Sequence, residues 1–140
     1  MSFELFLQSF SDGAPSGIPL EAIRAAFGSA LSEPEEDFWI ASYGDGLSSD
    51  LFLVPLTGQP SLIHTLSIHR PCADERLYEG LWRILEQPGT LLYFPGGPAP
   101  LTRDGSIARA MPPSMREALG APTIATTAAE ILHTIGTDHE

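Results

Sequence analysis

The residues of this chain that could carry out chemistry are few and widely spaced. Histidine and cysteine supply five candidates: His64, His69, Cys72, His133 and His139. His64 and His69 are five residues apart on an expected strand, so their side chains face opposite sides and cannot chelate one ion together. Cys72 follows His69 and Arg70, which favour a thiolate, but no third group is evident that would orient a Cys–His pair. We therefore predict no catalytic residue and no cofactor.

Two loops have residue types that could suit an ion site. The segment 45–50 has an aspartate at each end but lacks the alternating ligands and terminal glutamate of a calcium loop. Pro95-Gly96-Gly97-Pro98 could form a backbone concavity for an anion, but it lacks the lysine and the helix start of a phosphate loop. We interpret it as a stiff turn and predict no metal site.

The charge of the chain is strongly negative and unevenly distributed. Eighteen acidic residues face seven basic ones, for a net charge of −11, and every basic residue is an arginine. Between Arg24 and Arg70 there is no arginine or lysine. That interval contains Glu33, Glu35, Glu36, Asp37, Asp45 and Asp50. Such a surface repels nucleic acid and anionic membranes and favours a basic protein partner. The alternative is a solvated surface that only aids solubility.

Aromatic residues of the expected strand 38–43 could form the centre of a binding surface. Trp39 and Tyr43 share one face of that strand, and Phe38 and Ile40 share the other. If helices cover the Phe38 face, Trp39 and Tyr43 lie on the open side of the sheet, flanked by acidic loops. The predicted partner-binding residues are Glu33, Glu35, Glu36, Asp37, Trp39, Tyr43, Asp45 and Asp50.

Hydrophobic periodicity predicts the elements that position these residues. We expect strands over 3–10, 38–43, 51–56, 62–69 and 91–94, and helices over 19–31 and 74–87. A short helix over 113–119, a short strand over 122–126 and a last helix opened by a Thr127–Glu130 capping box follow. The prediction is one α+β domain over 1–140. It has a mostly antiparallel sheet of about five strands, two main helices on one face and a short helical C-terminal tail, with a ferredoxin-like variant as the nearest arrangement.

The single cysteine excludes an intrachain disulfide, and the N-terminus lacks both a basic region and a long apolar run. We therefore expect a cytoplasmic protein without a membrane span. It would be a monomer or a homodimer.

In size, acidity and layout the chain resembles the small immunity proteins that protect bacteria from secreted polymorphic toxins. Phe10-Ser11-Asp12-Gly13, Arg70-Pro71 and Tyr93-Phe94-Pro95-Gly96 also look like segments of an uncharacterised bacterial family. The resemblance implies a binding protein that occludes the active site of a cognate basic toxin, and it assigns no residue a role.

Two alternatives remain open. One is a small enzyme or ligand-binding domain with a pocket on the open sheet face, where His64, Cys72 or Asp45 carries the chemistry. The other is a homo-oligomer formed through Trp39 and Tyr43.

Overall fold

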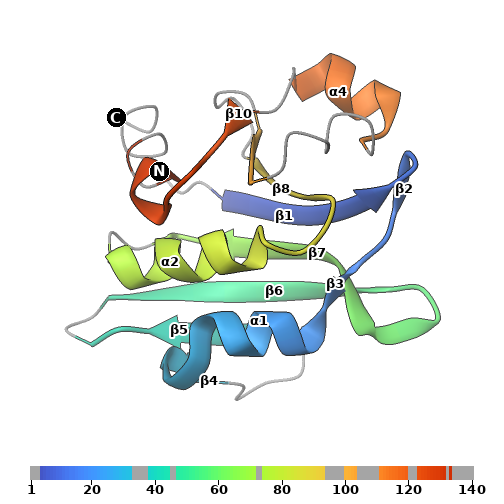
Figure 1. The fold of residues 1–140 in the computed structure, drawn as a ribbon. Coiled ribbons are helices and arrows are strands. Elements are labelled where there is room, and N and C mark those ends of the chain that lie inside the picture. Colours follow the sequence, from blue (N-terminus) through green and yellow to red (C-terminus); the bar gives the residue numbers. More distant parts are fainter. Residues whose placement is uncertain are drawn as a thin grey trace.

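The computed structural model describes residues 4–32, 38–44, 47–71, 74–93, 100–103, 111–119, 123–131 and 133. These residues form an α+β fold around one ten-stranded sheet (Figure 1). Eight of its strands follow the order β10-β9-β8-β1-β7-β6-β5-β4, and the other two, β2 and β3, pair with β1 and β7. The strands are β1 (Glu4–Ser11), β2 (Ala14–Pro15), β3 (Ile18–Pro19), β4 (Leu31–Ser32), β5 (Phe38–Ser42), β6 (Ser48–Leu56), β7 (Gln59–His69), β8 (Thr90–Tyr93), β9 (Leu101–Thr102) and β10 (Thr123–Ile124). The helices are α1 (Leu20–Phe27), the 3₁₀ turn η1 (Gly28–Ala30), α2 (Glu75–Ile84) and α4 (Pro113–Leu119).

The sheet is mostly antiparallel, as the short turns predicted. β5, β6 and β7 form the expected meander, and β1 lies between β7 and β8. The prediction of about five strands is too low because five two-residue strands extend the sheet, one of which, β10, runs parallel to β9. The two residues of a strand this short do not produce a recognisable alternation in the sequence.

The first helix is shorter than its apolar stripe predicted. α1 ends at Phe27, and Gly28 follows with φ 54°, a left-handed conformation that ends a helix at low cost for glycine. Leu31, expected on the helix, instead lies in β4, where it pairs with Ala41 of β5. The second helix begins as predicted, because the Asp74 carboxylate accepts a hydrogen bond from the Arg76 backbone N–H at 2.8 Å.

The core lies between the sheet and helices α1 and α2, which lie along the same side of it (Figure 1). Ile23 and Phe27 of α1 and Leu77, Leu81 and Ile84 of α2 are buried there. They belong to one cluster with the strand residues Leu5, Leu7, Trp39, Ala41, Leu51, Leu66 and Ile68. The two main helices therefore pack on one face, as predicted.

A second, smaller cluster includes Phe10, Leu91 and Met111, with Tyr93 and Met115 packed against it. Met115 belongs to α4, so this helix adds apolar cover beside β1 and β8. In the described part of the chain, no helix is both long and apolar enough to cross a membrane.

Candidate binding face of the sheet

The register of the central strands decides which side chains share a face. Leu5, Ile68, Leu51 and Trp39 are cross-strand neighbours, and all four are buried beneath the helices. Because successive residues of a strand point to opposite faces, the adjacent row points away from the helices. That row consists of Glu4, His69, Asp50 and Ile40.

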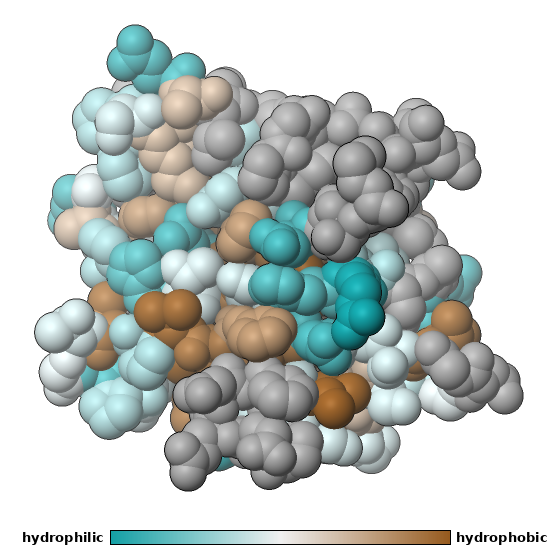
Figure 2. Space-filling model, turned by 180° about the vertical axis from the view of Figure 1, so that it is seen from behind, coloured by the Kyte–Doolittle hydropathy of each residue, from teal (hydrophilic) through white to brown (hydrophobic). Residues whose placement is uncertain are grey.

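A row of aromatic residues runs beside the charged row. Tyr93 pairs with Phe6, Phe6 with Ser67, and Ser67 with Phe52 across β8, β1, β7 and β6. Phe6 and Tyr93 stack with ring centroids 5.5 Å apart, and the Phe52 ring lies 4.4 Å from the His69 ring. We call the surface made by Glu4, Phe6, Asp50, Phe52 and His69 the open face. Figure 2 shows the molecule from behind, where hydrophilic and hydrophobic areas lie side by side.

The charges of the open face are paired loosely. His69 Nδ1 lies 3.6 Å from Glu4 Oε1, and both side chains are more than a third exposed. Arg70 Nη2 donates to Asp50 Oδ2 at 2.8 Å, although the Arg70 side chain is 72% exposed. Ion pairs this exposed contribute about 0–1 kcal/mol to stability, so exchanging a partner costs little.

A chain of hydrogen bonds continues the open face towards β8. The Tyr93 hydroxyl donates to Gln8 Oε1 at 3.0 Å, and Gln8 Nε2 donates to Thr65 Oγ1 at 2.9 Å. Thr65 Oγ1 also lies 2.7 Å from His64 Nδ1. Burial raises the pKa of Tyr93 above its usual value of 10.0. These side-chain hydrogen bonds link the three neighbouring strands β8, β1 and β7.

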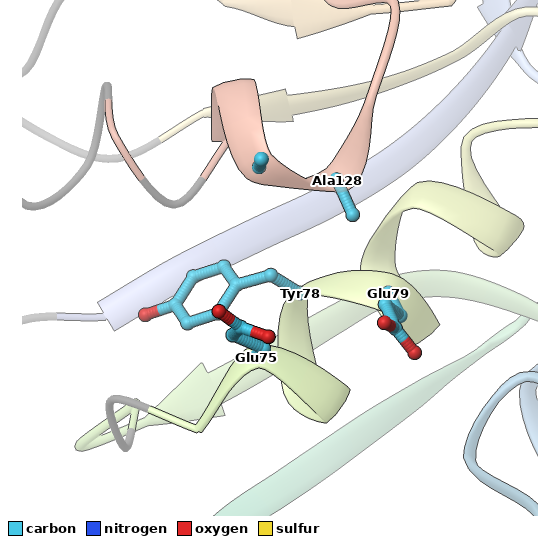
Figure 3. Close-up of a pocket in the computed structure, with 5 residues that line it drawn as sticks. Glu75, Tyr78, Glu79 and Ala128 are labelled. Atoms are coloured by element: carbon cyan, nitrogen blue, oxygen red, sulfur yellow. The ribbon is translucent and has the colours of Figure 1, made fainter.

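Three hollows lined by described residues lie on the helix side. One of about 120 Å³ lies between α2 and the helical turn at 128–131, where Glu75, Tyr78 and Glu79 face Ala128 (Figure 3). A second of about 310 Å³ shares Glu79 and Ala128 with it and extends to Trp82 and Thr127, and a third of about 280 Å³ lies between α1 and α2. None of these three includes His64 or Asp50, so none is the open-face pocket that the enzyme alternative needs.

The C-terminal turn beside the 120 Å³ hollow is capped at Thr127, as the sequence predicted, but the return bond of the capping box goes to Thr126 in place of Thr127. The Glu130 backbone N–H donates to Thr127 Oγ1 at 3.2 Å, and the Glu130 carboxylate turns back to accept from the Thr126 N–H.

The structure separates the three predicted partner-binding residues that it describes, Trp39, Tyr43 and Asp50. Glu33, Glu35, Glu36, Asp37 and Asp45 lie outside the described residues, as do Cys72, His139 and Pro95-Gly96-Gly97-Pro98. Asp50 lies on the open face. Trp39 is only 8% exposed and belongs to the core, with the Arg24 guanidinium 5.4 Å from its ring centroid.

The expectation that Trp39 and Tyr43 face the open side is therefore wrong. Tyr43 packs against the same core, and the Arg76 guanidinium lies 5.0 Å from its ring centroid. The helices cover the Trp39 face of β5 because that face continues the aliphatic row of Leu51 and Ile68. Sequence reasoning missed Glu4, Phe6, Phe52, His69 and Arg70 as one surface. The sequence signal that could have found this surface is the presence of apolar residues on both faces of β1. That pattern indicates a central strand, as β1 is between β7 and β8.

Within the described ranges, we find no group of three or more histidine, cysteine, aspartate or glutamate residues that could hold a metal ion. The His69 ring is instead engaged by Glu4 and Phe52. Compared with known proteins, this chain matches no family model, no curated protein and no solved structure.

Proposed function

We propose that this protein is a binding domain that recognises a basic protein partner through the open face. Within that class, we propose the role of an immunity protein, which occludes the active site of a cognate basic toxin. The observation that carries the proposal is the placement of the Glu4–His69–Asp50 row beside Phe6 and Phe52, on the side of the sheet away from α1 and α2.

The two rows would contribute different parts of the binding energy. Aromatic rings provide rigid apolar contact area and are enriched among the residues that dominate interface energies. Phe6 and Phe52 are half-buried by their strand neighbours, so little conformational freedom is left to lose on binding. The carboxylates attract a basic partner and raise its association rate, an effect that salt screens.

Three of the described arginines form their ion pairs away from these carboxylates. Arg24 pairs with Glu21, Arg76 with Asp74, and Arg103 with Glu86. All three pairs involve residues of the helix side or its neighbourhood, away from the Glu4 row. These three pairs leave the Glu4 and Asp50 carboxylates to other groups, and of these two Asp50 is already paired with Arg70.

The test is co-expression with the product of the adjacent gene, followed by co-purification at low and high salt and by a growth assay. The Glu4→Gln/Asp50→Asn double variant is expected to weaken the complex at least tenfold and to lose protection. The matched control is Glu21→Gln/Glu86→Gln, which removes two charges from other surface ion pairs. It should change affinity less than threefold. Equal effects of the two double variants, or no complex at either salt concentration, would contradict the proposal.

A further inference from the structure

Arg70 differs from Arg76 and Arg103 in how it is held. Arg76 donates to Asp74 and to the Tyr43 carbonyl oxygen. Arg103 stacks on the Trp82 ring with its guanidinium carbon 3.5 Å from the centroid, and it donates to the Trp82 carbonyl oxygen. Within the described part of the chain, the Arg70 guanidinium has one hydrogen-bonded partner, the Asp50 carboxylate.

The backbone fixes Arg70 at the rim of the open face. It follows the last residue of β7 and has φ 51°, a left-handed conformation that non-glycine residues adopt infrequently. Ser49 Oγ donates to the Arg70 carbonyl oxygen at 3.2 Å, which ties this bend to β6. The main chain is therefore anchored next to Asp50 while the side chain remains mostly exposed to water.

The carboxylate that Arg70 occupies lies next to an aromatic ring. Asp50 and Phe52 are two residues apart on β6 and therefore share the open face. Asp50 also pairs across the strands with His69, whose ring tilts against Phe52. A planar guanidinium can donate to a carboxylate and stack on a ring at once, which an ammonium group cannot match.

We infer that Arg70 is an internal competitor that holds the Asp50 carboxylate until an arginine side chain of the basic partner displaces it. The inference rests on the proposed function and deepens it by naming the group that the open face recognises. On displacement, Asp50 exchanges one guanidinium for another, Arg70 returns to water, and the incoming arginine gains the Phe52 ring. Because a lysine gains less from that ring, the site prefers arginine over lysine through Phe52.

If Arg70 is a competitor, replacing it should strengthen the binding of a basic partner. The gain should exceed the gain from removing an equal positive charge elsewhere on the surface. Releasing Asp50 from an exposed ion pair corresponds to roughly two- to fivefold in affinity. The matched control is Arg24, another exposed arginine in a surface ion pair, with Glu21. Arg70→Gln and Arg24→Gln change the net charge equally, so a difference between them reports the site and not the overall charge.

The experiment is a titration of the isotopically labelled full chain with an acetylated hexa-arginine peptide and, in parallel, a hexa-lysine peptide, followed by amide chemical shifts. Arg70→Gln should bind hexa-arginine about two- to fivefold more tightly than Arg24→Gln, with the largest shifts at Asp50, Phe52 and His69. Asp50→Asn should lose this gain. If Arg70→Gln binds no more tightly than Arg24→Gln while wild-type shifts still map to the open face, the competitor role is overturned and the proposed function stands. If shifts map only to α2 and its neighbours, the proposed function itself fails.

Discussion

The two faces of the central sheet are built from the same strands and differ in almost everything else. Beneath the helices, Leu5, Leu51, Leu66 and Ile68 have no exposed surface. One residue along each strand, the opposite face carries acids, aromatic rings and a histidine that remain in part exposed. The comparison indicates that alternate residues of one strand serve stability and recognition. Residues of the open face can therefore be substituted while the buried face continues to hold the fold.

The sharpest test of this division compares two adjacent residues of β7. Ile68→Ala removes a fully buried side chain from the main cluster and is expected to cost about 2–5 kcal/mol. His69→Ala removes an exposed ion-pair partner and one ring contact, and should cost no more than about 1 kcal/mol. Urea unfolding of both variants measures the difference. Equal losses would mean that the open face also holds the fold together.

The covered face makes a second prediction at the contact between its helices. A Cβ atom at Gly80 would lie 2.9 Å from two Phe27 ring atoms and 3.2 Å from the Ala26 carbonyl oxygen. Gly80→Ala gains up to about 1 kcal/mol of helix propensity but overpacks the contact at a cost of about 1–3 kcal/mol. We expect a net loss of about 1 kcal/mol by urea unfolding. Glu79→Ala, exposed on the same helix, is the control. A Gly80→Ala variant more stable than the wild type would show that Phe27 and α1 move to accommodate the added methyl group at little cost.

At alkaline pH the fold should lose stability through the ionisation of Tyr93. Its pKa is raised by burial, so the folded state holds the phenolic proton more tightly than the unfolded state does. The stabilisation is fully present below pH 10.0 and is lost as the pH rises through the folded-state pKa. Unfolding measured across this range should show a decline that Tyr93→Phe removes. An unchanged decline in that variant would assign it to another group.

The smallest effect is expected on the helix side, at acid pH. Hydrogen bonds from the Arg76 side chain and backbone lower the pKa of Asp74 from 3.8 to about 2. A lowered carboxylate pKa stabilises the fold above pH 3.8, and this contribution is lost as the pH falls towards 2. Carboxyl carbon NMR can follow the titration directly. Arg76→Ala should raise the Asp74 pKa towards its ordinary value, and an unchanged pKa would contradict the assigned cause.

Local signals in the sequence predicted the elements with short-range causes. The Asp74 cap, the Thr127–Glu130 box, the two amphipathic helices and the β5–β6–β7 meander all depend on neighbours within a few residues. A proline within a strand favours an edge or a strand end, and Pro55 lies next to the last residue of β6, with register shifts on both sides of it. The prediction of Trp39 as an exposed anchor failed because β5 has apolar residues on both faces, which leaves its orientation undetermined by its own pattern.

The sequence by itself therefore determined a strongly acidic α+β chain whose bases are all arginine and whose central strands are apolar on two faces. Only the tertiary structure decided which face the helices cover, because that choice depends on burying the largest continuous aliphatic surface across several strands at once. The same choice brought Glu4, Asp50, Phe52 and His69 together from three separate strands. Cross-strand register is a property of pairs of segments, so no single stretch of sequence encodes it.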